Sequence, residues 1–317
     1  MSIDRQLSVI APTDLEMASF PEIASQQKMA LLERLKREGA LLFRGFDIRS
    51  AEDFDRFIGQ FGLVNFPYEA SFSNAVRRNR TERVFTANEA PPDVEIFLHH
   101  EMAQTLIFPE QLFFFCEQPP AVGGSTPICW SDLSLQTLEQ RAPKFVQRLR
   151  DRGIRYRNTM PAYAELASAQ GRSWKDTLKV ESAEQAEQKL TSLGYDYQWL
   201  NNGYLSVRTP PLAAIQAFDQ HSSFFNQIVA AYVGWQSSLD PDDPILTYGD
   251  GSHIAIEDLE LAVEVCYQHV VDLDWQQGDV ALLDNTRVMH GRRPYQGART
   301  VLASLCSPIR RSSMTRL

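Results

Sequence analysis

The chain has 317 residues, of which 44% are apolar, so it can bury a full hydrophobic core. Its formal net charge of −9 argues against a general nucleic-acid-binding protein, because such proteins neutralise phosphates with an excess of lysine and arginine. No segment has the pattern of a secretory signal or the length of a membrane span, so we expect a cytoplasmic protein that binds no membrane.

The first elements are predicted to be a helix, a strand and a second helix. Ser19 and Glu22 have the spacing of a capping box, and the apolar residues that follow predict an amphipathic helix ending near Gly39. A short strand at 40–43 comes next, and the apolar period of 50–61 predicts another helix. We expect these pieces to pack outside the main sheet.

Two groups of predicted strands are separated by a long segment of mixed, largely helical character. The early strands, at 106–108, 112–116 and 126–128, are rich in β-branched and aromatic residues and are bounded by proline and glycine. Helices are predicted within 131–153, where Pro143 is an interruption, and at 224–235 and 256–269. The late strands are predicted at 270–275, 280–283 and 300–305.

This order predicts a fold that is mainly β with flanking helices. We expect one domain over 1–317, a double-stranded β-helix (jelly roll) with core strands at about 83–130 and 270–307. A helical insert of about 131–269 would separate the two strand sets. The four cysteines, which form no Cys-x-x-Cys pair, are expected to be buried and reduced.

The short motif at His99-His100-Glu101 is a candidate metal site. In an extended strand, His99 and Glu101 would share one face and His100 would point to the other. His290, at the end of a predicted turn and buried strand, is the best candidate for a third ligand, and the set would form a 2-His-1-carboxylate triad suited to non-haem Fe(II). The motif alone recurs by chance, so an ordinary core or surface histidine is the better interpretation of His99 until other motifs are added.

Two further residues are candidates for binding a carboxylate. The turn at 123–127 could present the hydroxyl of Thr126, although by itself it is only a turn. Arg299 begins an apolar strand, where its planar guanidinium could bind a carboxylate through two hydrogen bonds. The alternative for Arg299 is an ion pair with an acidic side chain at the rim of the barrel.

The sequence resembles the TauD/TfdA family of Fe(II)/2-oxoglutarate-dependent dioxygenases in the order of its motifs. These motifs are His99-x-Glu101, Gly-Gly-x-Thr126, Trp-x-x-Gly-Asp, Asp284-Asn285, His290-Gly291-Arg292 and Gly-x-Arg299. The resemblance extends over about 39–307. The segments 155–158, 247–251 and 290–295 are most similar to the clavaminate-synthase-like and syringomycin-type amino-acid hydroxylases.

The resemblance implies that His99, Glu101 and His290 bind Fe(II), while Arg299, helped by Thr126, binds the distal carboxylate of 2-oxoglutarate. O2 would be the second co-substrate, and the products would be succinate, CO2 and a hydroxylated substrate. Related halogenases need a small residue at the position of Glu101, so halogenation is disfavoured. Taurine-type relatives carry a second arginine at the position of Ala303, so an alkyl sulfonate substrate is also disfavoured.

The expected substrate is an amino-acid-like molecule of a natural-product pathway, either free or attached to a peptidyl carrier protein. Arg157, Asn158 and Arg292 are candidate substrate-binding residues, and ordinary packing or surface roles are the alternative for each. The same iron centre could instead catalyse desaturation, cyclisation or epoxidation. Two alternatives from other classes are a non-catalytic jelly-roll binding protein and a zinc protein. The sequence does not indicate an oligomeric state.

Overall fold

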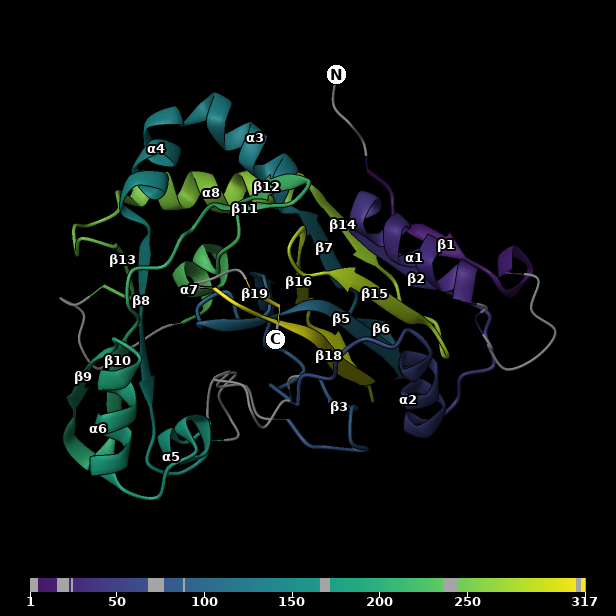
Figure 1. Cartoon of the computed structure of the whole chain (residues 1–317), viewed down its shortest axis with the longest axis horizontal. Coiled ribbons are helices and arrows are strands. Elements are labelled where there is room, and N and C mark those ends of the chain that lie inside the picture. The colour runs from purple at the N-terminus through teal and green to yellow at the C-terminus, as the bar shows by residue number, and fades with distance from the viewer. Residues whose placement is uncertain are drawn as a thin grey trace.

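Two β-sheets packed face to face form the centre of the molecule (Figure 1). The computed structural model describes residues 5–15, 23, 25–67, 77–87, 89–165, 172–235, 244–311 and 315–316. The larger sheet has the strand order β1 (Ser8–Ile10), β2 (Ala40–Phe43), β15 (Val280–Asp284), β5 (Ile107–Gln118), β18 (Thr300–Arg310) and β19 (Thr315–Arg316), and β3 (Phe85–Thr86) pairs with β18. All of these pairs are antiparallel except β1 with β2.

The smaller sheet has four antiparallel strands in the order β14 (Val270–Leu273), β7 (Thr126–Trp130), β16 (Val288–Arg292) and β4 (Ile96–His99). Alternate residues of both sheets point into the space between them, including Leu112 and Phe114 of β5 and Ile128 and Trp130 of β7. A short pair, β6 (Val122–Gly123) with β17 (Tyr295–Gln296), extends this layer. The predicted jelly-roll fold is therefore confirmed.

Two N-terminal helices cover the outer face of the larger sheet. In α1 (Ser25–Glu38) and α2 (Ala51–Gln60), apolar side chains pack on a second core layer that includes Phe113 and Phe115 of β5. Ser50 caps α2 by accepting a hydrogen bond from the backbone N–H of Asp53 at 3.2 Å. The capping box at Ser19 and Glu22 lies outside the described residues. The short 3-10 helix Pro12–Leu15 precedes α1.

The strand β2 corrects one expectation, because it belongs to the larger sheet and does not lie outside it. It pairs with β15, and all four of its residues are buried. A strand this short and apolar shows no alternation of polar and apolar residues, so its sequence could not distinguish an outer position from one between two neighbouring strands.

The segment 131–269 covers the outer face of the smaller sheet with helices and adds a sheet of its own. The helices α3 (Ser131–Arg141), α4 (Pro143–Arg152), α7 (Ile228–Gly234) and α8 (Ile256–Gln268) share a core with Leu98 of β4 and Met289 of β16. Pro143 occupies the first turn of α4, where its missing N–H has no helical partner to lose.

The sheet of this segment was not predicted from the sequence. Its strand order is β13 (Leu246–Tyr248), β8 (Ile154–Met160), β10 (Leu205–Arg208) and β9 (Asp196–Trp199). The helices α5 (Trp174–Leu178) and α6 (Ala183–Ser192) lie beside β9 and β10 (Figure 1). A hairpin of β11 (Gln216–Phe218) and β12 (His221–Ser223) and the 3-10 turn Asn201–Gly203 complete the segment. Among the described helices, none is long and apolar enough to cross a membrane.

Candidate metal centre

Strand pairing brings His99 and His290 together. The two residues are direct partners in the antiparallel pair of β4 and β16, and their ring centroids lie 4.4 Å apart. Directly paired residues point to the same face of a sheet. The ring of His290 also lies 5.1 Å from that of Phe114 on the opposite sheet, so both imidazoles face the space between the sheets.

Glu101 reaches the same place by a different route from the one that the sequence predicted. The strand β4 ends at His99, and Glu101 lies in a turn in which Met102 has a φ of 59°. The buried side chain of Asn285 fixes this turn, because its Oδ1 accepts a hydrogen bond from the N–H of Glu101 at 2.8 Å and its Nδ2 donates to the carbonyl of Glu101 at 3.0 Å. The alternation of a strand therefore does not explain why His99 and Glu101 converge.

The three side chains have the geometry of a metal site. One ligand atom from each of His99, Glu101 and His290 lies within 4.8 Å of the others, and the Nε2 of His290 is 3.8 Å from the Oε2 of Glu101. The Nδ1 of His99 lies 2.8 Å from the carbonyl oxygen of Phe97, which places the ring proton on Nδ1 and leaves the lone pair of Nε2 for an ion.

The protonation states also suit a metal. Burial lowers the pKa of His99 and lowers that of His290 well below its usual value, so both rings are neutral near pH 7. Burial is the largest single effect on Glu101 and acts to raise its pKa, but the charge and hydrogen bond of Arg77 together with the electrostatic effect of His99 outweigh it, and the pKa is lowered. A metal ion binds an imidazole in its neutral form and a carboxyl group in its ionised form. Two histidine nitrogens with one carboxylate are the ligands of many non-haem Fe(II) sites, so these residues fit a ferrous ion.

Arg77 is a member of the centre that the sequence did not indicate. Its Nη2 lies 2.9 Å from the Oε2 of Glu101, and the two side chains are 7% and 4% exposed. Nothing in the sequence marks this arginine, because it stands among other arginines and has no fixed spacing to the His99 motif.

Thr126 and Arg299 lie towards one end of the same inter-sheet space. Thr126 is two residues from Ile128, the direct partner of His290, so its side chain shares their face. Its Oγ1 accepts a hydrogen bond from the Nε1 of Trp275 at 3.0 Å. The Nε of Arg299 donates to the carbonyl of Gly124 at 3.1 Å, two residues before Thr126.

The guanidinium of Arg299 is mostly buried. Burial lowers its pKa to about 10, and the group lies 5.6 Å from the ring centroid of Tyr295. The alternative of an ion pair at the rim is not seen, since no carboxylate of the described chain contacts Arg299. A buried arginine in this state is suited to an anionic ligand.

The three predicted substrate residues lie in two different places. Arg292 is two residues beyond His290, and its guanidinium donates to the carbonyls of Ala90, Pro91 and Val94 at 2.6 to 2.9 Å, which holds the loop that leads into β4. Arg157 and Asn158 lie on β8, in the sheet of the segment 131–269. A role of these residues in substrate binding stays a prediction.

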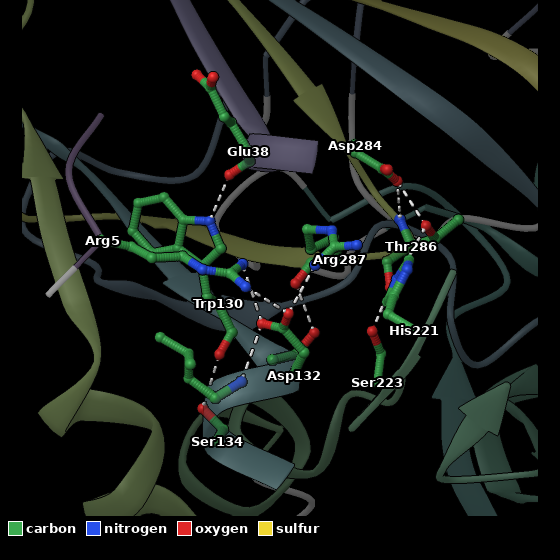
Figure 2. Close-up of polar contacts among 12 residues, drawn as sticks. Arg5, Glu38, Trp130, Asp132, Ser134, His221, Ser223, Asp284, Thr286 and Arg287 are labelled. Atoms are coloured by element: carbon green, nitrogen blue, oxygen red, sulfur yellow. Dashed lines mark hydrogen bonds and ion pairs between the residues drawn. The ribbon is translucent and has the colours of Figure 1, made fainter. Parts of the chain in front are cut away.

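Buried polar contacts hold the turn between β15 and β16, which delivers His290 (Figure 2). The Oδ1 of Asp284 accepts hydrogen bonds from the N–H and hydroxyl of Thr286 at 2.9 and 2.6 Å, and the carbonyl of Thr286 accepts one from the hydroxyl of Ser223 at 2.6 Å. Arg287 forms a buried ion pair with Asp132 of α3 at 2.7 Å. These contacts join β16 to the helices that cover it.

The chain is similar in sequence and in fold to several known proteins. The family model described as taurine catabolism dioxygenase TauD, TfdA family matches residues 4–306. A clavaminate synthase-like protein of Arabidopsis thaliana is 38% identical over 294 residues, which cover 92% of this chain and 88% of the relative. The dapdiamide synthesis protein DdaC of Enterobacter agglomerans is 26% identical over 291 residues, which cover 87% of this chain and 84% of that protein. The crystal structure of PvcB from Pseudomonas aeruginosa has the same fold, with a TM-score of 0.54 at 15% identity over 95% of this chain and 87% of PvcB.

Proposed function

The chain belongs to the TauD/TfdA family of Fe(II)/2-oxoglutarate-dependent dioxygenases, and on this premise we propose that it hydroxylates an unactivated C–H bond of an amino-acid-like substrate. The overall reaction balances as 2-oxoglutarate, O2 and a C–H bond giving succinate, CO2 and a C–OH group. The observation that carries the proposal is the convergence of one ligand atom each from His99, Glu101 and His290 within 4.8 Å.

In this proposal His99, Glu101 and His290 hold Fe(II) on the inner face of the smaller sheet. The bound ion supplies the redox chemistry that couples reduction of O2 to decarboxylation of 2-oxoglutarate and oxidation of the substrate. The carbonyl of Phe97 keeps the Nε2 of His99 free for the ion, and Asn285 holds the backbone of Glu101 in position. The surrounding apolar residues of the inter-sheet core exclude water from the centre.

Arg299 and Thr126 are proposed to bind 2-oxoglutarate. The planar guanidinium of Arg299 suits the distal carboxylate, which would give this buried cation the anion that no described residue provides. Because the Oγ1 of Thr126 already accepts the hydrogen bond of Trp275, its own O–H is directed elsewhere and can donate to the same carboxylate.

The relatives support a small substrate from a natural-product pathway. DdaC takes part in dapdiamide synthesis, as its name states, and it matches most of this chain. We therefore propose an amino-acid-like substrate, free or attached to a carrier protein. Desaturation, cyclisation or epoxidation of such a substrate would use the same centre.

The test is to supply amino acids and amino-acid amides, free and carrier-tethered, to the ferrous protein with 2-oxoglutarate and O2, and to measure succinate and product mass. Hydroxylation predicts succinate in equal amount to a product that has gained one oxygen atom, and no succinate for Glu101→Ala. A product that has lost two hydrogen atoms would show that the reaction is desaturation or cyclisation and not hydroxylation. A variant Glu101→Ala with full activity would remove Glu101 from the site.

A further inference from the structure

The ion pair between Arg77 and Glu101 lies inside the centre that is proposed to bind the metal. The Oε2 of Glu101 is shared, because it lies 2.9 Å from the Nη2 of Arg77 and 3.8 Å from the Nε2 of His290. This carboxylate oxygen lies next to a second candidate ligand, His290. The guanidinium of Arg77 therefore binds the oxygen that a metal ion would use.

The backbone places Arg77 firmly at this position. The adjacent residue, Arg78, exchanges hydrogen bonds with Thr86 of β3, through its N–H to the Oγ1 at 2.9 Å and through its carbonyl to the N–H at 2.8 Å. The guanidinium of Arg77 lies 5.3 Å from the ring centroid of Phe85, whose partner in β18 is Ala303. Arg77 is thus tied to the larger sheet while its side chain reaches the ligands of the smaller one.

The net charge of the centre differs between its metal-free and metal-bound states. Without metal, the charges of Glu101 and Arg77 cancel. A divalent ion would add two positive charges beside a guanidinium that is almost fully buried. At an effective dielectric constant of about 20, a single and a double positive charge about 6 Å apart repel strongly enough to weaken binding of the ion by about tenfold or more.

We propose that Arg77 is the internal counter-ion of the metal-free centre. It neutralises Glu101 before the metal binds and leaves the shared carboxylate oxygen when the metal arrives. Its positive charge lowers the affinity of the centre for the metal and raises the affinity for the dianionic 2-oxoglutarate. This inference rests on the proposed function. It makes Arg77 a positioning residue that acts through Glu101, and it predicts opposite effects of one substitution on a cation and an anion.

The test uses Arg77→Gln, which removes the charge but keeps a donor for Glu101. Binding of Mn(II) to the metal-free protein is measured by calorimetry without O2, and binding of 2-oxoglutarate is then measured on the Mn(II)-loaded protein. We expect Mn(II) to bind at least about tenfold more tightly than in the wild type, because the repulsion is gone. We expect 2-oxoglutarate to bind at least about threefold less tightly, because a positive charge near this dianion is lost. A loss of structure would weaken both.

The matched control is Arg80→Gln, the same change at a partly exposed arginine that pairs with Glu117 at 3.2 Å. It is expected to leave both affinities unchanged. Thermal unfolding gives a second reading: without metal Arg77→Gln leaves the buried Glu101 without its counter-ion and lowers the Tm, and Mn(II) raises the Tm of this variant more than that of the wild type. If Arg77→Gln does not fold, Arg77→Lys, with its shorter reach, is expected to shift both affinities in the same directions by less.

Weaker Mn(II) binding in Arg77→Gln, or unchanged binding of both ligands, would overturn the role of Arg77 and leave the proposed function intact. If the wild-type protein binds neither Mn(II) nor 2-oxoglutarate, the proposed function fails and this inference fails with it.

Discussion

At the scale of single residues, the centre depends on side chains that hold the ligands as much as on the ligands. His100 is an example, since it stands between His99 and Glu101 in the sequence and its Nδ1 lies 2.5 Å from the carbonyl oxygen of Asn285. Its ring packs against Phe225, with the centroids 4.6 Å apart. His100 therefore supports the residue that fixes the turn of Glu101, and it is not one of the three residues whose ligand atoms converge.

Replacing His100 by alanine separates these roles. The variant loses a buried hydrogen bond and leaves a cavity beside Phe225, which should lower the free energy of unfolding by about 2 to 4 kcal/mol. Affinity for Fe(II), measured well below the Tm, is expected to stay within a few-fold of the wild type. If the folded variant no longer binds iron, His100 and not His99 is the ligand.

Asp284 gives a pH dependence of stability. Burial raises its pKa from 3.8 to about 6, which corresponds to a contribution of the protonated group of about 3 kcal/mol to the free energy of unfolding. Because the pKa in the folded protein is the higher one, the contribution is complete below the ordinary value of 3.8 and is lost as the pH rises through about 6.

The variant Asp284→Asn cannot ionise and keeps an oxygen to accept the two hydrogen bonds of Thr286. Urea unfolding of both proteins between about pH 4.5 and about pH 8 should therefore show the variant gaining stability relative to the wild type as the pH rises. A constant difference across this range would contradict a protonated Asp284 in the folded protein.

Among single residues, the sequence indicated the groups with recognisable chemistry and spacing. The structure brings ligand atoms of His99, Glu101 and His290 within 4.8 Å of one another. The roles of these three residues and of Thr126 and Arg299 stay predictions. Arg77 could not be found in this way, because its contact with Glu101 depends on how β3 docks on β18 and not on any local pattern.

At the scale of elements, the register of β4 against β16 decides whether the two histidines meet. The pairing shifts between His290 and Arg292, where Gly291 lies against β4. A Cβ at Gly291 would come within 2.4 Å of the carbonyl oxygen of Ile96 and 3.2 Å of the Cγ of Pro127. Neither contact involves the end of a flexible side chain, so the strands would have to separate.

The variant Gly291→Ala is therefore expected to move His99 away from His290, to weaken Fe(II) binding by about tenfold or more, and to cost about 1 to 3 kcal/mol of stability. Gly59→Ala is the control, because there the nearest atom is the Nη1 of Arg83, at the end of a flexible side chain. Equal metal affinity in the two variants would show that the approach of β4 to β16 does not set the geometry of the centre.

Helices and strands whose apolar residues recur with a clear period were predicted well, and those without such a period were not. The helix over 50–61 appears as α2, with Ser50 as its cap. The predicted strand extending to Glu101 ends at His99, because the hydrogen bonds of Asn285 favour a turn there. The sheet of β8, β9, β10 and β13 was missed because its strands are short and pair across long stretches of sequence, which a local pattern does not reveal.

At the scale of the whole molecule, two sheets separated by a long segment of sequence build one centre. His99 comes from the early strand set and His290 from the late one, and the helices over 131–269 cover the outer face of the sheet on which they meet. The order of strands and motifs was enough to predict that His99 and His290 meet, but not which face of the sheet the inserted helices cover. The substrate could not be predicted, because the residues around it depend on how the inserted segment packs.

The most direct test of the central claim is the binding of 2-oxoglutarate to the protein without O2, measured by calorimetry with and without Fe(II). We predict that 2-oxoglutarate binds only when iron is present, and that Glu101→Ala loses both the metal and 2-oxoglutarate. In Arg299→Ala, Fe(II) should still bind and 2-oxoglutarate should bind about a hundredfold more weakly, because only the charge-assisted contact to its distal carboxylate is removed. Binding of 2-oxoglutarate that is independent of Fe(II), or unchanged in Arg299→Ala, would contradict the central claim.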